Sequence, residues 1–288
     1  MQSHHSCDVL LKIEGGNELI IGLSSVVTGY NPKLALRMCD ELGLAGVEHL
    51  PGRYDKFEHL VALSGEYQKP FLGFHDVWWN SKSFWYWMRT SGIKGKLESL
   101  AWLMMINTAE GNDAAIRFAQ KLGGYTIIHA DLAWELTHEL NGTIPSFAVI
   151  ENVDSPHRKV PRGFGTALFM ARELGLDLCL NTTHIGLCKE DLLGTFELYH
   201  GRIKVVHFSD YRTGSSDYKQ GHDLPGEGNL PLAKLLKMMK EYSWNGIIII
   251  EIKPVGKVCI KGIPIILDYE RTKANVKRTL AFIHEHLR

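Results

Sequence analysis

Eight short apolar runs recur along the chain, and this repetition constrains the fold more than any other feature of the sequence. Most are rich in Val, Ile, Leu or Phe and lack polar alternation, which is typical of strands buried on both faces. The runs are Leu19–Leu23, Gly46–Leu50, Pro70–His75, Tyr125–His129, Phe147–Glu151, Leu176–Leu180, Ile203–Phe208 and Gly246–Ile252.

Segments with helical spacing lie between these runs. Asn31 and Pro32 are a good N-cap and first residue for a helix over Pro32–Leu42, and Gly175 is a good C-cap after another helix. The other predicted helices are Phe164–Leu174, Pro231–Tyr242, Tyr269–Leu287 and more than one within Lys96–Leu122, while Ala130–Ser146 has room for about two turns.

The alternation predicts an α/β fold, a (β/α)8 TIM barrel, over an open doubly wound sheet as the alternative. We expect one domain over residues 1–288, with the barrel proper over about 19–286.

The composition excludes several classes of protein. The 32 basic residues equal the 32 acidic ones, so the basic excess typical of nucleic-acid binding is missing. The five cysteines form no CxxC pair and predict free thiols in a reducing compartment. No targeting segment is apparent, and the longest apolar runs are too short to span a membrane. We therefore expect a cytoplasmic protein that binds small molecules.

Polar residues stand at or near the ends of the predicted strands. In a barrel these ends meet at one mouth, where active sites form. Carboxylates, imidazoles and an amide without thiolates are a typical set of metal ligands. The residues are Glu48, His75, His129, Glu151, Asn181, His184, His207, Asp210 and Glu251.

The sequence resembles the xylose isomerase-like barrel superfamily, which contains metal-dependent sugar isomerases and epimerases and the endonuclease IV type of abasic-site nuclease. The resemblance runs from about Leu19 to His286 and is carried by short motifs at the strand ends. These are VIEN at 149–152, NTTH at 181–184, HFSD at 207–210, LPGEG at 224–228 and IIIEI at 248–252.

The resemblance to the isomerase and epimerase branch implies one divalent metal (Mn, Mg, Co or Zn) and no nucleotide cofactor. Its ligands would be Glu151, Asn181, His207 and Glu251, with Asn181 where the family usually has Asp. Glu151 and Glu251 would exchange a proton beside a carbonyl through an enediolate, and His184 would orient the substrate oxygens. Asp210 would fix the second nitrogen of His207.

Two other functions stay open. The nuclease branch implies a zinc cluster on His75, His129, Glu151, Asn181, His184, His207, Gln220, His222 and Glu251. Because two of these residues are amides where the nuclease has aspartates, and the charge is balanced, nucleic acid is not the expected partner. The other alternative is a polyol dehydratase or lyase, or a sugar-binding barrel without turnover. Glu48 and Asp210 remain candidates for additional ligands.

Two loops could contact the substrate. Trp78 and Trp79 follow the third strand and are predicted as a lid over a sugar, together with Arg212. The alternative is that these aromatic side chains pack on the barrel or form a contact between subunits of a homo-oligomer. A basic loop at Arg158–Arg162 favours a phosphate or carboxylate on the substrate.

Overall fold

The computed structural model describes residues 10–12, 18–51, 55–75, 114–138, 143–153, 161–213, 221–260 and 263–287. Its eight parallel strands close into a barrel in the order β2–β11–β8–β7–β6–β5–β4–β3, with β3 paired back to β2. The strands are β2 (Glu18–Ser24), β3 (Val47–His49), β4 (Phe71–His75), β5 (Tyr125–His129), β6 (Ala148–Glu151), β7 (Asp177–Asn181), β8 (Ile203–Phe208) and β11 (Ile247–Ile250). The predicted TIM barrel is confirmed.

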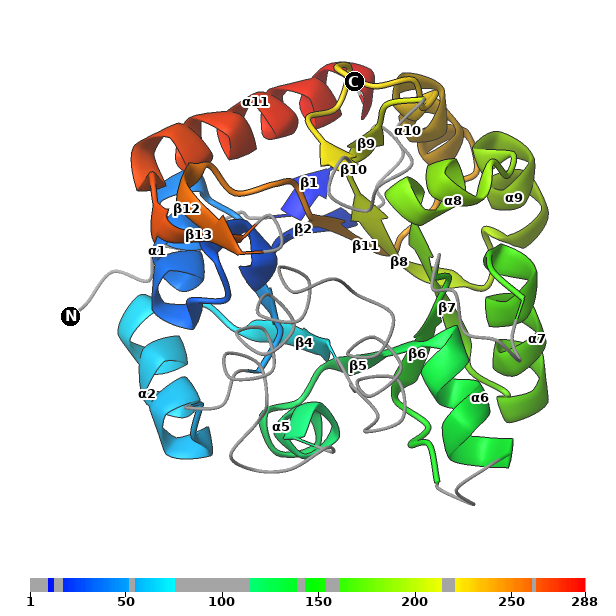
Figure 1. Cartoon of the computed structure of the whole chain (residues 1–288), viewed down its shortest axis with the longest axis horizontal. Coiled ribbons are helices and arrows are strands. Elements are labelled where there is room, and N and C mark those ends of the chain that lie inside the picture. The colour runs from blue at the N-terminus through cyan, green and yellow to red at the C-terminus, as the bar shows by residue number, and fades with distance from the viewer. Residues whose placement is uncertain are drawn as a thin grey trace.

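Helices surround the strands on the outside (Figure 1). The predicted bounds of α1 and α7 are confirmed, and Asn31 caps α1 by accepting from Leu34 N. The helices are η1 (Ser25–Thr28), α1 (Pro32–Leu42), α2 (Phe57–Tyr67), α5 (Ala114–Leu122), α6 (Ala130–His138), α7 (Phe164–Leu174), α8 (Thr182–Cys188), α9 (Leu192–Tyr199), α10 (Leu232–Glu241) and α11 (Tyr269–Leu287).

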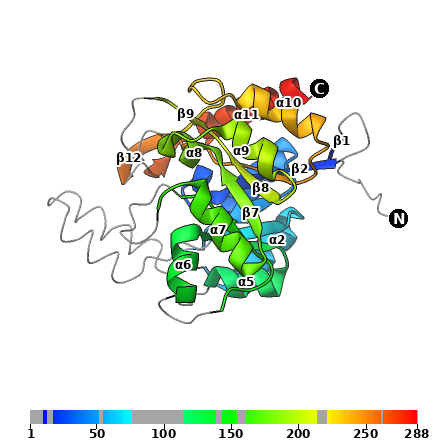
Figure 2. The ribbon, with the colours of Figure 1, turned by 90° about the vertical axis from the view of Figure 1, so that its right-hand side faces the viewer.

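Among the described residues, five short strands that the sequence does not predict lie outside the eight barrel strands. β1 (Leu10–Lys12) pairs with the start of β2, and β9 (Asp210–Tyr211) pairs with β10 (Gly221–Asp223). β12 (Gly256–Ile260) and β13 (Ile263–Leu267) form a hairpin between β11 and α11. Figure 2 shows β12 and β1 at opposite ends of the barrel.

Alternation along the strands divides the core into two layers. One set of side chains packs between strands and helices, whereas Ile127, Val149, Cys179, Val205 and Ile249 pack together inside the barrel. Because side chains of a strand alternate between its faces, the residue two positions after each of these also points inward. This places the predicted polar residues at the carboxyl-end mouth of the barrel.

Gly73 makes room for a ring inside the barrel. A Cβ at this position would lie 2.4 Å from the ring of Tyr125 on the neighbouring strand β5. The absent side chain therefore lets Tyr125 lie across the barrel interior toward β3. Within the described part of the chain, no helix has the length and apolarity needed to cross a membrane.

Candidate active site

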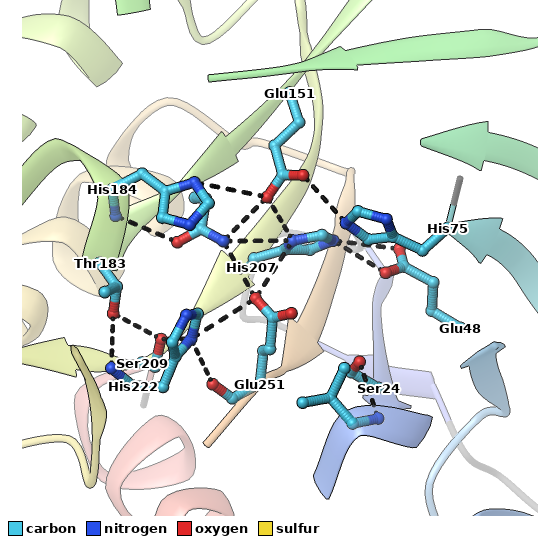
Figure 3. A network of polar contacts seen from close by, with 12 residues as sticks. Ser24, Glu48, His75, Glu151, Thr183, His184, His207, Ser209, His222 and Glu251 are labelled. Carbon is cyan, nitrogen blue, oxygen red and sulfur yellow. Dashed lines mark hydrogen bonds and ion pairs between the residues drawn. The ribbon is translucent and has the colours of Figure 1, made fainter. Parts of the chain in front are cut away.

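A buried cluster of polar side chains fills the mouth of the barrel (Figure 3). The central cluster consists of Glu48, His75, His129, Glu151, Asn181, His207 and Glu251. All except His129 are at most 6% exposed, and the side chain of His129 is 30% exposed. The structure thus brings together residues separated by up to 203 positions along the sequence, counted from Glu48 to Glu251.

Glu151, at the end of β6, uses its two oxygens for different partners. Oε2 lies 3.0 Å from His75 Nε2 and 3.1 Å from His129 Nε2. Oε1 accepts from Asn181 Nδ2 at 2.8 Å and lies 2.9 Å from His207 Nδ1. The carboxylate therefore joins an imidazole pair on one side to the Asn181–His207 side of the cluster.

Glu251 follows β11 and lies on the Asn181–His207 side. Its Oε2 accepts from Asn181 Nδ2 at 3.0 Å and lies 3.3 Å from His207 Nδ1. Glu151 and Glu251 are thus held near each other by one amide nitrogen and one ring nitrogen.

Glu48, on β3, orients His207 from inside the barrel. It accepts from Tyr125 Oη at 2.8 Å, and its oxygens lie 3.0 and 3.1 Å from His207 Nε2. Burial and the charge of Glu48 raise the pKa of Tyr125 well above its usual value, so the phenol stays protonated and donates. Asp210 does not fix His207, contrary to the expectation from sequence, because Glu48 takes that position.

The buried charges stabilise one another. Burial opposes ionisation of Glu251, but His207 and His222 lower its pKa to about 2. Burial likewise opposes the charge on Glu151, yet His207 and His75 hold its pKa well below the usual range. Burial disfavours the charged form of His129, and the hydrogen bond to Glu151 outweighs it and raises the pKa to about 9. Both carboxylates are therefore ionised at neutral pH, and they face protonated imidazole.

His184 and His222 lie at the rim of the central cluster. The Nδ1 of His184 contacts the carbonyl oxygen of Asn152 at 2.7 Å and lies 3.9 Å from Glu151 Oε1. The Nδ1 of His222 contacts the carbonyl oxygen of Glu251 at 3.0 Å, and burial lowers the pKa of this imidazole. Both candidates thus lie beside the carboxylates, as Figure 3 shows.

Asp210 and Arg212 lie outside the central cluster. Both oxygens of Asp210 accept backbone N–H groups, Gly226 and Gly228 on Oδ2 and Tyr211 and Leu230 on Oδ1. Arg212 donates to the carbonyl oxygen of Glu227 at 3.2 Å. Both side chains therefore hold the loop around 224–230, and backbone N–H groups occupy the acceptor positions of Asp210 that an additional ligand would use.

Several predicted residues lie outside the described part of the chain. They are Trp78 and Trp79 of the expected lid, Gln220 of the expected zinc cluster, and Arg158 and Lys159 of the basic loop.

Three groups of described residues bring possible metal ligands within 4.8 Å of one another: Glu48, His75 and His207; His75, His129 and Glu151; and Glu151, Cys179 and His207. Burial raises the pKa of the Cys179 thiol to about 12, which disfavours the thiolate that a metal needs. Two imidazoles and one carboxylate are a common donor set for a catalytic divalent ion. The residues His75, His129 and Glu151 therefore fit a metal, and the partial exposure of His129 gives access to them.

A cavity adjoins His222 at the same end of the barrel. It has a volume of about 340 Å³, and its lining includes His222, Asp223, Leu224, Glu227, Lys253 and Asn275. The ammonium group of Lys253 lies 3.2 Å from Asp223 Oδ1. Its volume is at the lower end of the range of small-molecule sites, and its lining mixes polar side chains with the apolar Leu224, Pro254 and Val255.

Comparison with known proteins agrees with this geometry. Residues 146–284 match the family described as "Xylose isomerase-like TIM barrel". The described part of the chain as a whole has the TIM barrel fold. The matched region includes Glu151, Asn181, His207 and Glu251, whereas Glu48, His75 and His129 precede it. No curated protein sequence matches the chain significantly.

Solved structures share the fold over nearly the whole chain. D-allulose 3-epimerase from Methylomonas sp. has a TM-score of 0.60 at 14% identity, covering 94% of this chain and 98% of its own. 3-Keto-D-glucoside 4-epimerase from E. coli has a TM-score of 0.58 at 12% identity, covering 91% and 99%. An IolI protein with a bound zinc atom has a TM-score of 0.56 at 15% identity, covering 93% and 98%. At these identities the likeness concerns the fold.

Sequence reasoning missed two residues of the site. In the sequence, Tyr125 stands at the start of a strand and Asn152 stands beside Glu151 at a strand end, and neither is among the predicted site residues. Asn152 accepts from Asn181 N at 2.7 Å and donates to Asn181 O at 3.2 Å, which ties the ends of β6 and β7 together. The pairing of Gly73 with Tyr125 on adjacent strands is a signal for the first, and the adjacency of Asn152 to Glu151 is one for the second.

Proposed function

We propose that this barrel is an isomerase or epimerase that moves a proton between carbon atoms of a sugar or sugar phosphate. The observation that carries the proposal is that two buried carboxylates, Glu151 and Glu251, lie side by side at one barrel mouth. The fold shared with two sugar epimerases supports it. The cavity beside His222 has the volume of a small-molecule site, which supports a sugar ligand. Lys253 in its lining can contact an anionic group such as a phosphate.

The chemistry follows from the placement of the carboxylates. Proton abstraction beside a carbonyl develops negative charge on oxygen, and that charge sets the barrier. One of Glu151 and Glu251 removes the proton as a carboxylate. The carboxylic acid so formed returns this proton to carbon, or passes it to the other carboxylate, which then returns it. The protonated ring of His129 is a donor that can orient a substrate oxygen. The Nδ1 of His184 donates to the carbonyl oxygen of Asn152, so its Nε2 can accept from a substrate hydroxyl. A divalent ion bound by His75, His129 and Glu151 would supply Lewis-acid stabilisation of the same charge.

The test is carbon-bound proton exchange. The full chain is incubated in D2O with a panel of ketoses and ketose phosphates, with and without Mn²⁺, and deuterium incorporation is followed by NMR. Glu151→Gln and Glu251→Gln should each slow exchange by about 10²- to 10⁴-fold because each removes an acid–base group. Asp177→Asn is the matched control, since Asp177 begins β7 at the other end of the same barrel and is exposed. Exchange that survives both glutamine substitutions would refute these roles.

The His75–His129–Glu151 group favours a second candidate, a metal-dependent abasic-site nuclease. These are three of the nine zinc ligands that the resemblance to that branch implies. The discriminating assay is nicking of a duplex that carries one abasic site by metal-loaded protein. Nicking that is lost in His75→Ala, without any proton exchange on sugars, would replace the first proposal with this one.

A further inference from the structure

The space between Glu151 and Glu251 is filled by the side-chain nitrogen of Asn181. Asn181 Nδ2 donates to Glu151 Oε1 at 2.8 Å and to Glu251 Oε2 at 3.0 Å. One amide group has two N–H bonds, and here each is directed at a different carboxylate. The amide therefore bridges the two acids in the way that a bound cation would.

The other end of the same amide is fixed as well. Asn181 is the N-cap of α8, and its Oδ1 accepts from the backbone N–H of His184 at 3.2 Å. If the amide turned over, its oxygen would face two carboxylate oxygens and its NH2 group would face another N–H. Both ends of the side chain therefore select the same orientation.

The backbone of Asn181 holds the residue in place. Asn152 bonds to both the N–H and the carbonyl of Asn181, and the residue is 1% exposed. The side chain is thus anchored at its backbone, at its oxygen and at its nitrogen. A shift that moves the nitrogen away from the carboxylates would break the helix cap.

An aspartate at this position would behave differently. One of its oxygens could cap α8 while the other faced a cation, because a carboxylate accepts at both oxygens. Asparagine has only one oxygen, and the cap uses it. It also adds no charge, so a cation between Glu151 and Glu251 would lose both a ligand and a compensating negative charge.

We propose that Asn181 closes the position between Glu151 and Glu251 to divalent cations, so that this centre binds a cation only on its His75–His129–Glu151 side. The two oxygens of Glu151 keep these sides apart, since Oε2 faces the imidazole pair and Oε1 faces Asn181. The inference concerns ion binding and holds whether or not the proposed sugar reaction occurs.

The experiment measures Mn²⁺ binding to the full chain after chelator treatment, with free Mn²⁺ followed by electron paramagnetic resonance. Any Mn²⁺ that the natural chain binds at this centre should be lost in His129→Ala. The double variant with His129→Ala and Asn181→Asp should regain one ion, bound about 100-fold more tightly than by His129→Ala alone. Thermal unfolding should shift upward with Mn²⁺ in the double variant and stay unchanged in His129→Ala.

Asn152→Asp is the matched control, because it adds the same charge one strand away without facing Glu251. It should gain no ion in the His129→Ala background. A folded double variant that gains no ion would overturn the proposal. The proposal would also be overturned if His129→Ala retained an ion and a further Glu251→Gln substitution removed it. This second comparison keeps the natural Asn181. The measurement contains no sugar, so its outcome is independent of the exchange assay.

Discussion

Two buried acidic sites lie at the same end of the barrel, and they differ in what their oxygens contact. Glu151 and Glu251 contact imidazole nitrogens and an amide side chain. Asp210 accepts hydrogen bonds from four backbone N–H groups. Imidazoles exchange protons near neutral pH and can bind metals, whereas backbone amides do neither. The first site is therefore suited to chemistry, and the second to holding a loop.

Close packing around Asp210 agrees with a structural role. A Cβ on Gly228 would lie 2.2 Å from Asp210 Oδ1, so the loop backbone lies directly against the carboxylate. The absent side chain of Gly228 is what allows this approach.

The largest effect should come from Asp210→Ala. The substitution leaves several backbone N–H groups at a buried position without their acceptor, and hydrogen bonds to a charged group are the costly ones to lose. We expect the free energy of unfolding to fall by about 3 to 4 kcal/mol, measured by urea denaturation at pH 7. Asp223→Asn, which affects the partly exposed pair with Lys253, should cost less than about 1 kcal/mol. Equal losses in the two variants would contradict the structural role of Asp210.

The next effect is acid unfolding of the chelator-treated chain. The folded pKa of Glu251 is about 2, below its ordinary value of 4.5. A lowered pKa stabilises the fold above pH 4.5, and this stabilisation is lost as the pH falls through 2. The loss should be about 3 kcal/mol, measured as unfolding free energy between pH 5 and 2. Glu251→Gln should show a correspondingly flatter acid limb, and an unchanged slope would contradict the ion pairing.

A smaller effect of opposite sign should appear at alkaline pH. The folded pKa of His129 is about 9, above its ordinary value of 6.5. A raised pKa stabilises the fold fully below pH 6.5, and this stabilisation is lost as the pH rises through 9. Because the side chain is partly exposed, we expect about 1 to 2 kcal/mol. Thermal unfolding of His129→Asn should lack this dependence, while Asp210→Ala should retain it.

Much of the fold could be predicted from sequence because buried parallel strands are continuous apolar runs. Tyr125–His129 and Ile203–Phe208 were predicted with their observed bounds, as were α1, α7 and α11. The β12–β13 hairpin was not predicted, because no strand was recognised within the connection between β11 and α11.

The site was less accessible to sequence reasoning. Strand ends indicated which residues meet, but not which atoms face each other. Glu48 and His207 are 159 positions apart, and only the closed barrel pairs them. Asp210 and His207 are neighbours in sequence, yet Asp210 points to the loop because β9 begins there. The orientation of the Asn181 amide depends on its role as the N-cap of α8. The family resemblance implies only a metal ligand at this position and does not indicate the cap.

The smallest expected effect separates the two residues that hold the 224–230 loop. Arg212 is exposed and donates one bond to the carbonyl oxygen of Glu227, whereas Asp210 is buried and accepts several bonds from the same segment. An exposed bond competes with water on equal terms, so Arg212→Ala should change the free energy of unfolding by less than about 0.5 kcal/mol. If Arg212 belongs to a substrate lid as well, the same variant should raise KM for a sugar phosphate without altering stability. A stability loss comparable to that of Asp210→Ala would contradict this and show that the loop depends on the exposed hydrogen bond of Arg212.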